Sequence, residues 1–432
     1  MSPFLDRRAF LGRLAVTGVA AGVMPPVDLA AKFAADEPFA FGPQDDDAKV
    51  FAAARKRFLF PTSVTYCNTG TLGAIPRDVM DVVVKGLQQL EQELPDWPYF
   101  QADGEPLTGY QPLTEFRAEA GAFINAPADE IAFTQNATMG MSFIANGLEL
   151  VAGDEILSTN QEHTGGIGGW RLRAKRHGVV VKELPLFDTL AKGPDGVVAM
   201  FADAITPRTR VIVFSHITSG RGIKMPAREL CALARERGVL SVVDGAQAVG
   251  QMRVDVKQLG CDAYVASPHK WLLAPKGTGI LYIRREMQPR VWTTLASAAF
   301  DDESTGAFRF MHFGTGSPAV VWGLSAALKF ISKIGIDRIE RWDGMLTKRL
   351  RDGLATMPHA RLTSPADPRF AAAITTFAVT GHTGRELQDA LWRQRIRVRA
   401  QGGDAGVRLS AHFYVSPRDI DHVLDVVASM RS

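Results

Sequence analysis

Short apolar runs alternate with amphipathic stretches from about Phe51 to the end of the chain. The apolar runs are rich in β-branched residues and lack the polar alternation of half-exposed strands, which is typical of strands covered on both faces. This pattern predicts an α/β protein with a mostly parallel sheet. The predicted strands are Ile131–Thr134, Glu155–Ser158, Val179–Leu184, Arg210–Ser215, Val239–Asp244, Asp262–Ala266 and Thr278–Ile283.

Helical periodicity occupies segments between these strands. The predicted helices are Met139–Val151, Gly169–Arg176, Pro226–Arg237 and Val256–Leu259. Two longer helices, Ser317–Ile334 and Arg338–Met357, follow the last strand, and Asp337 is a candidate N-cap of the second.

The C-terminal part mixes strands and helices in a different order. Its predicted elements are the strands Ala372–Val379, Ile396–Ala400 and Val407–Phe413 and the helices Arg385–Arg395 and Pro417–Met430. We therefore predict an N-terminal segment (36–75), a large domain (76–317) with a seven-stranded sheet, and a small α+β domain (318–432).

The first residues have the layout of an export signal. Arg7-Arg8 is followed by Phe10-Leu11, an apolar run from 14 to 24, and Pro25-Pro26. The apolar run is too short to cross a bilayer as a helix, which needs ~20 residues. We predict that residues 1–35 are a twin-arginine-type signal peptide and that the protein is exported, to the periplasm. The alternative is an arginine-rich tail on a cytoplasmic protein.

Composition excludes several other classes of protein. The net charge of the 432 residues is only +3 and no basic run occurs, so a nucleic-acid partner or a polybasic membrane contact gains no support. We expect no integral membrane segment in the mature protein. The three cysteines are far apart, and no C-x-x-C or H-E-x-x-H motif is present, so neither a disulfide framework nor a metal site is indicated.

Polar residues stand where four of the predicted strands end. Ligands of parallel sheets bind beyond the carboxyl ends of the strands, so these residues are candidates for one site. They are Asn136-Ala137-Thr138, His163, Asp244 with Gln247, and Ser267-Pro268-His269-Lys270. Each alone has a structural explanation, such as a helix cap or a solvated loop lysine.

Together, these residues match the chemical needs of pyridoxal 5'-phosphate (PLP). PLP needs a lysine for its Schiff base, a carboxylate at its pyridine nitrogen, a helix N-terminus at its phosphate, and a flat side chain on its ring. We expect Lys270, Asp244, Ala137-Thr138 and His163 to fill these roles in turn. Asn136, Ser267 and His269 would complete the phosphate site, and Gln247 would reach the phenolic oxygen.

Longer motifs resemble one family. They are Asn68-Thr69-Gly70, Asn136-Ala137-Thr138, Asp244-Gly245-Ala246-Gln247, Ser267-Pro268-His269-Lys270-Trp271, Pro275-Lys276-Gly277-Thr278-Gly279, Gly314-Thr315-Gly316 and the run from Arg408 to Tyr414. The sequence resembles the class V aminotransferase family of fold-type I PLP enzymes, and within it the isopenicillin N epimerase-like branch. Gln247 stands where that branch tends to have histidine.

The resemblance implies a large cofactor domain, a small C-terminal domain, and a homodimer with shared active sites. It implies that Thr315 reaches the cofactor phosphate of the partner subunit. It also implies that Arg408, with its bidentate guanidinium group, binds a substrate carboxylate, and Asn68 is a second expected substrate-binding residue.

The expected activity is chemistry at the Cα of an amino acid or an amino-acid-like substrate. Lys270, Asp244 and His163 are the expected catalytic residues, and transamination, epimerisation and lyase chemistry all remain open. A desulfurase needs a cysteine well after the lysine, and none follows Cys261. Epimerisation ordinarily uses a second acid–base group, for which Cys67, Tyr99 and Tyr110 are the candidates. Another alternative is a non-enzymatic exported binding protein of the same fold.

Overall fold

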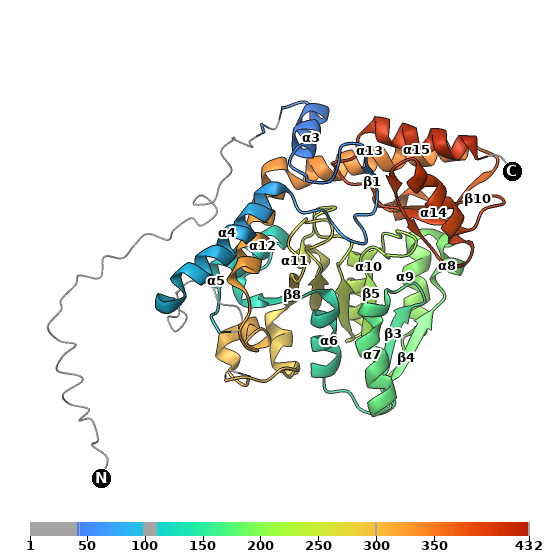
Figure 1. Ribbon diagram of the computed structural model, residues 1–432. Helices are drawn as coiled ribbons and strands as arrows, with labels where there is room; N and C mark the ends of the chain where they lie inside the picture. Colours follow the sequence, from blue (N-terminus) through green and yellow to red (C-terminus); the bar gives the residue numbers. More distant parts are fainter. Residues whose placement is uncertain (1–40, 43, 98–109, 299, 431–432) are drawn as a thin grey trace, which may run out of the picture.

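The computed structural model describes residues 41–42, 44–97, 110–298 and 300–430 (Figure 1). The predicted signal peptide (1–35) and Tyr99 lie outside the described residues. A seven-stranded sheet with the strand order β2-β8-β7-β6-β5-β3-β4 forms the centre of the molecule. β8 runs antiparallel to both of its neighbours and the other strand pairs are parallel, which confirms the predicted α/β class and the mostly parallel sheet.

The predicted strands of this sheet are all present, and their ends differ from the prediction by no more than one residue. They are β2 (Ile131–Thr134), β3 (Glu155–Thr159), β4 (Val180–Leu184), β5 (Thr209–Ser215), β6 (Leu240–Asp244), β7 (Ala263–Ala266) and β8 (Gly279–Ile283). All residues of β2, β3, β6, β7 and β8 are buried, as expected for strands covered on both faces.

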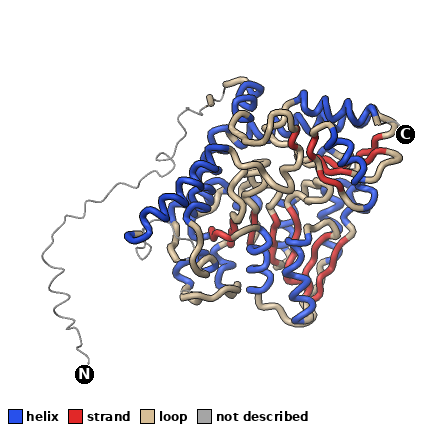
Figure 2. Tube along the Cα trace, viewed as in Figure 1, coloured by secondary structure: helices blue, strands red, loops and turns tan. Residues whose placement is uncertain are grey.

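Helices surround the sheet (Figure 2). The helices of this part of the chain are α4 (Arg77–Glu93), which packs against the later helix α12 (Pro318–Ile334), and α5 (Thr114–Ile124), α6 (Ala137–Gly147), α7 (Thr164–His177), α8 (Leu186–Thr189), α9 (Gly193–Ala204), α10 (Ala227–Glu236) and α11 (Val256–Leu259). Among these, α4, α5, α8 and α9 were not predicted. α6 and α7, which pack against each other, both begin earlier than predicted because Asn136 and His163 cap them.

The C-terminal part forms its own antiparallel sheet, with the strand order β12-β13-β10-β9. Its elements are α12 (Pro318–Ile334), α13 (Ile336–Ala355), β9 (Ala360–Leu362), β10 (Thr375–Val379), α14 (Gly384–Arg393), β11 (Ile396–Arg397), β12 (Arg399–Ala400), β13 (Val407–Leu409) and α15 (Pro417–Ser429). The prediction that Asp337 caps α13 is wrong. Gly335 precedes the helix, and Asp337 lies in its first turn, where it pairs with Arg253.

An N-terminal segment links the two parts. After α3 (Asp47–Arg55), strand β1 (Thr65–Tyr66) pairs in parallel with β11. The chain then turns toward the sheet, where the Gly73 N–H donates to the carbonyl of His269 (2.9 Å). A Cβ atom at Gly73 would lie 1.9 Å from the Lys270 carbonyl oxygen, so glycine allows this close packing.

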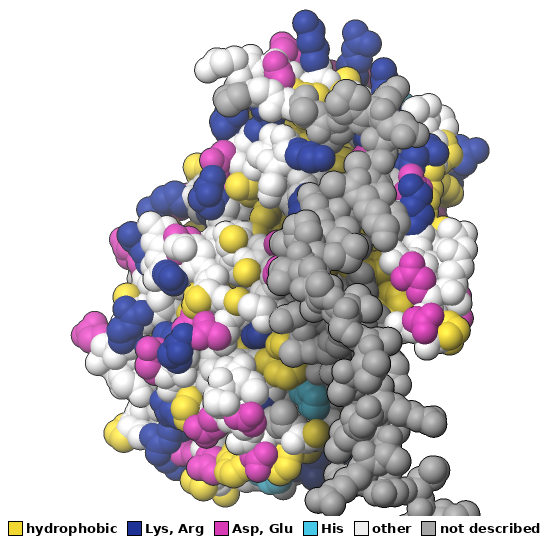
Figure 3. Space-filling view, turned by 90° about the vertical axis from the view of Figure 1, so that its left-hand side faces the viewer, with side chains coloured by type: hydrophobic (Ala, Val, Ile, Leu, Met, Phe, Trp, Pro, Cys, Tyr) yellow, Lys and Arg dark blue, Asp and Glu magenta, His cyan; other side chains and the backbone are white. Residues whose placement is uncertain are grey.

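Two features of the described residues bear on membrane and nucleic-acid binding: the distribution of surface charge and the length of apolar helices. On the face shown in Figure 3, basic and acidic side chains are interspersed. In the described part of the chain, no single helix has the length and apolar composition needed to cross a membrane, whereas α12 and α13 together, bent by 73°, pass that test on length and composition only.

A buried contact between an aspartate and a histidine ties α13 to the segment that follows β13. Asp343 Oδ2 lies 2.7 Å from His412 Nδ1, and His412 Nε2 lies 2.9 Å from the carbonyl oxygen of Trp271, the residue after Lys270. The side chains of both Asp343 and His412 are almost fully buried. This contact supports the loop that carries Lys270.

Asp343→Ala is expected to lower the free energy of unfolding by about 3 kcal/mol, because it leaves a buried histidine without its partner. Asp337→Ala is the matched control: it breaks an exposed pair on the same helix and is expected to cost less than about 1 kcal/mol. Urea denaturation of the two variants measures the difference, and equal effects would contradict a structural role for Asp343.

Candidate active site

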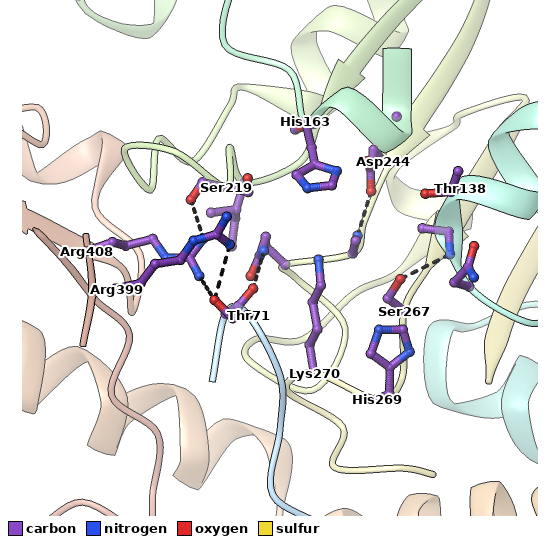
Figure 4. A pocket seen from close by; sticks show the side chains of 18 residues that line it. Thr71, Thr138, His163, Ser219, Asp244, Ser267, His269, Lys270, Arg399 and Arg408 are labelled. Carbon is purple, nitrogen blue, oxygen red and sulfur yellow. Dashed lines mark hydrogen bonds between the residues drawn. The ribbon is translucent and has the colours of Figure 1, made fainter. Parts of the chain in front are cut away.

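A cavity of about 340 Å³ lies at the carboxyl ends of the central strands. All of the predicted site residues except Asn68 and Thr315 line it. The lining residues are Gly70, Thr71, Asn136, Ala137, Thr138, His163, Gly166, Ser215, Ile217, Ser219, Asp244, Ala246, Gln247, Ser267, His269, Lys270, Arg399 and Arg408. The cavity thus gathers polar groups from both parts of the chain around Lys270 (Figure 4).

One end of the cavity lies at the N-terminus of α6. The Asn136 side chain caps this helix by accepting from the Met139 N–H (2.9 Å). The Ala137 N–H donates to Ser267 Oγ (3.0 Å), which joins the helix start to the loop that carries Lys270. The positive end of the helix dipole, with the nearby hydroxyl groups, favours a group with several anionic oxygens, such as a phosphate.

Asp244 ends β6, and its carboxylate is held in place. Oδ1 accepts from the Ala246 N–H (2.9 Å). The first turn of α7 approaches Oδ2 so closely that a Cβ atom on Gly166 would lie 2.7 Å from it. The side chain is buried, and this acceptor faces the cavity.

His163 opens to the cavity opposite Lys270 and caps α7. Its Nδ1 accepts from the Gly165 N–H (3.1 Å), so Nδ1 carries no proton. Partial burial and the charge of Lys270 lower the pKa of His163 below its ordinary value of 6.5. The ring is therefore neutral at pH 7 and presents a flat surface to the cavity.

Lys270 points into the middle of the cavity (Figure 4). Burial lowers the pKa of its amine from 10.5 to about 8; the Asp244 carboxylate acts in the opposite direction, and the charges of Arg408 and Arg399 lower the pKa further. With this pKa, about one tenth of the amine is the free base at pH 7, far more than for an ordinary lysine, and the free base is the form that acts as a nucleophile or a general base.

Gln247 lines the cavity, as predicted, and its side chain is buried. Its Nε2 donates to the Gly70 carbonyl (2.8 Å), and its Oε1 accepts from the indole N–H of Trp271 (2.8 Å). One N–H of the amide is left for a ligand. Gln247 therefore positions the loop that carries Lys270 as well as lining the cavity.

Two arginines form the other end of the cavity. Nη1 of Arg408 donates to the Ser219 carbonyl (2.8 Å), and both Arg408 and Arg399 donate to Thr71 Oγ1. The Thr71 hydroxyl in turn donates to Asn68 Oδ1 (2.8 Å). Asn68, a predicted substrate-binding residue, thus lies behind Thr71 and does not line the cavity.

Sequence reasoning missed Arg399 and a carboxylate near Asp244. Glu162 accepts from Ser215 Oγ (2.5 Å), and Ser215 lies beside Asp244 in the register of β5 and β6. Burial raises the pKa of Glu162 to about 7. In the sequence, only the position of Glu162 next to His163 pointed to this residue. That position alone does not indicate a role in the site.

Three further candidates do not line the cavity. Thr315 is exposed, so its predicted contact with the cofactor of the partner subunit stays a prediction. Cys67 is fully buried, and burial raises the pKa of its thiol. Tyr110 is 49% exposed. Neither Cys67 nor Tyr110 lines the cavity as a second acid–base group.

Known proteins are similar to this chain in sequence. The family model described as aminotransferase class-V matches residues 108–423. The chain belongs to the class V aminotransferase family. Isopenicillin N epimerase of Amycolatopsis lactamdurans is 31% identical to it over 409 residues, which cover 89% of this chain and 99% of that protein.

Solved structures agree with this assignment. A complex of the cystine C-S lyase C-DES with its reaction product cysteine persulfide matches with a TM-score of 0.77 and 26% identity, covering 85% of this chain and 98% of the lyase. A lysine-to-alanine variant of C-DES with glycine covalently linked to PLP matches with a TM-score of 0.78 and 25% identity. The match covers 87% of this chain and 99% of that protein. The chain is thus a PLP-dependent enzyme of fold type I, as predicted.

The residues of the cavity fit PLP, and two close approaches support this fit. A Cβ atom on Gly165 would lie 2.3 Å from Thr138 Oγ1, and one on Gly166 would lie 2.7 Å from Asp244 Oδ2. These glycines let α7 pack over the residues that would hold the phosphate and the pyridine nitrogen. The α6 terminus, Asp244 and Lys270 supply an anion site, a carboxylate and an amine in one cavity.

Gly166→Ala is expected to weaken PLP binding about 10- to 100-fold, because the added methyl group displaces the Asp244 carboxylate. Gly168→Ala is the matched control in the same helix, since a Cβ atom there meets nothing within 4 Å. Titration of the apoprotein with PLP, followed by absorbance, gives both dissociation constants. Equal affinities in the two variants would show that this close approach does not control cofactor binding.

Proposed function

We propose that the protein acts at the Cα of an amino acid or an amino-acid-like substrate, with Lys270 as the group that moves the Cα proton. The observation that carries this proposal is the position of Lys270 between Asp244 and the two arginines in one cavity. When bound, PLP supplies an electron sink for the charge left by the proton. The steps that follow removal of the Cα proton decide whether the enzyme is an epimerase, a transaminase or a lyase.

The chain supplies the remaining functions through named residues. Arg408 binds the substrate carboxylate and so fixes the position of Cα relative to Lys270. The Lys270 amine takes the Cα proton as a general base. Asp244 would face the pyridine nitrogen of the cofactor and stabilise its positive charge, and His163 would cover the ring and exclude water from one face.

The test uses purified, PLP-loaded protein without its first ~35 residues, the predicted signal. L- and D-amino acids and small peptides are incubated in D2O and followed by proton NMR and absorbance. Deuterium at Cα with mixing of chirality indicates an epimerase or racemase, a 2-oxo acid with pyridoxamine phosphate indicates a transaminase, and loss of a β-substituent indicates a lyase. No exchange with any substrate, despite full PLP loading, would contradict the proposal.

A C-S lyase is the second candidate reaction, favoured by the match to the cystine C-S lyase. Cystine belongs in the substrate panel for this reason. Cysteine desulfurase activity is less well supported, because no cysteine follows Cys261 and all three cysteines are buried.

The pH dependence of cofactor capture tests the environment of Lys270. Its pKa is lowered to about 8, so the free amine increases about tenfold per pH unit below 8 and levels off above it. The rate at which the apoprotein binds PLP is expected to follow this curve in stopped-flow absorbance. A rate that keeps rising to pH 10 would indicate an ordinary, unperturbed lysine.

We also propose that residues 1–35 direct export and that the mature protein is a homodimer with shared active sites. The twin arginines support the first proposal and the exposed position of Thr315 is compatible with the second. Replacing Arg7 and Arg8 with lysine is expected to retain the protein in the cytoplasm, whereas unchanged export would argue against this signal. Sedimentation measures the dimer, and a monomer with full activity would exclude shared sites.

A further inference from the structure

The guanidinium groups of Arg399 and Arg408 are held together by the fold. The two residues are direct partners in the antiparallel pair β12–β13, and both side chains donate to the single oxygen Thr71 Oγ1. Figure 4 shows them side by side at one end of the cavity. Like charges placed directly opposite each other on neighbouring strands repel, so this arrangement is unfavourable unless an anion joins it.

No carboxylate of the described chain balances these charges. The ion pairs among the described residues include neither arginine. Arg408 is only 2% exposed, and its Nε has no hydrogen-bond partner. Burial and the charge of Arg399 lower the pKa of Arg408 to about 10. A buried cation without a counterion is costly, so this end of the cavity is built for an anion.

The hydrogen-bond donors exceed what one carboxylate accepts. A guanidinium group has five N–H donors and a carboxylate about four acceptor sites. Arg408 uses donors on Ser219 and Thr71, and Arg399 uses one on Thr71, which leaves most of the donors of both groups for a ligand. Two cations with this many donors match two carboxylates better than one.

These anions belong to the substrate and not to the cofactor. The start of α6 and the hydroxyl of Ser267 form a separate anion site at the other end of the cavity, and Lys270 lies between the two ends. Buried Arg408 is suited to the carboxylate next to the reacting Cα. Arg399 is exposed, which places a second negative group nearer to solvent.

We propose that the substrate carries two carboxylates, one bound by Arg408 and the second by Arg399. The substrate class is therefore an acidic amino acid or an amino acid derivative with a second carboxylate. This inference rests on the proposed function, because it assumes that the first carboxylate belongs to the reacting amino acid.

Unreactive acids test this proposal directly on the PLP-loaded protein. Calorimetry is expected to show that glutarate binds about 10- to 100-fold more tightly than butyrate, the gain expected from one charge-assisted contact. Arg399→Gln is expected to bring the two affinities to within about threefold. Arg397→Gln removes another exposed charge, on a residue outside the cavity, and should keep the preference. Two results would overturn the proposal. One is equal affinity of the unmodified protein for glutarate and butyrate, and the other is an equal decrease in both affinities in Arg399→Gln. Either result would indicate that both arginines bind one carboxylate.

Hydrogen exchange at Cα separates this inference from the proposed function. If glutarate binding depends on Arg399 but no amino acid exchanges its Cα proton, the proposed function fails and the dicarboxylate site stands. If L-glutamate and neutral L-norvaline exchange equally well, and Arg399→Gln does not change their ratio, the proposed function stands and the dicarboxylate inference fails.

Discussion

Replacing Lys270 with alanine is expected to lower the rate of Cα proton exchange by at least about 10⁴-fold, because the variant loses both the nucleophilic amine and the general base. The visible absorbance of the lysine-bound cofactor should disappear at the same time. NMR in D2O and absorbance spectroscopy measure the two effects on one sample. The position of the amine in the centre of the cavity, together with its lowered pKa, is the reason for this expectation.

Lys276→Ala is the matched control for this experiment. Lys276 belongs to the same loop, and its Nζ donates to the Gly73 carbonyl (3.1 Å) outside the cavity. The rate of Cα proton exchange in Lys276→Ala is expected to stay within about threefold of the rate in the unmodified protein, because substitutions at the surface usually have small effects. If Lys270→Ala retained both exchange and absorbance, the assignment of Lys270 would have to be abandoned.

Asp244→Asn is expected to lower the exchange rate about 10²- to 10³-fold, because it removes the fixed negative charge that supports the pyridine nitrogen. Asp244→Glu is not expected to restore activity, since Gly166 leaves no room for a longer side chain beside the carboxylate. Steady-state kinetics on variants saturated with PLP separate this effect from weaker cofactor binding.

Asp262→Asn provides the comparison for Asp244. Asp262 precedes β7 at the opposite end of the sheet, where it accepts from the Ser241 N–H (2.8 Å) and pairs with Arg284 (2.6 Å). Its replacement should reduce stability with little effect on exchange. Equal kinetic losses in both variants would mean that Asp244 acts through the fold and not on the cofactor.

The sequence allowed most of the sheet and the centre of the site to be predicted, for a physical reason. Buried parallel strands are continuous apolar runs, and their carboxyl ends converge, so the polar residues at 244 and 267–270 had to lie close together. The start of α7 was missed because four glycines among residues 165–169 hide its helical pattern, and only the cap at His163 defines it.

The arginine end of the cavity was only half predicted. Arg408 was found through a family motif, whereas Arg399 lies on the two-residue strand β12, whose pairing with β13 brings it opposite Arg408. Such a register follows from turn geometry and tertiary packing and cannot be read from a run of two residues. Asn68 was predicted to bind the substrate because the sequence does not show that the Thr71 hydroxyl lies between the Asn68 side chain and the cavity.

The contacts of the N-terminal segment also set an order for folding. Thr71 and Arg408, which meet in the cavity, are 337 residues apart in the sequence. Closing so long a loop is entropically costly, and contacts of this kind form late, after the local and neighbouring strand pairs. A ribosome must therefore release nearly the whole chain before Thr71 meets its partners. The central sheet can assemble first, and the arginine end of the cavity, which we propose binds the substrate, is expected to form after it.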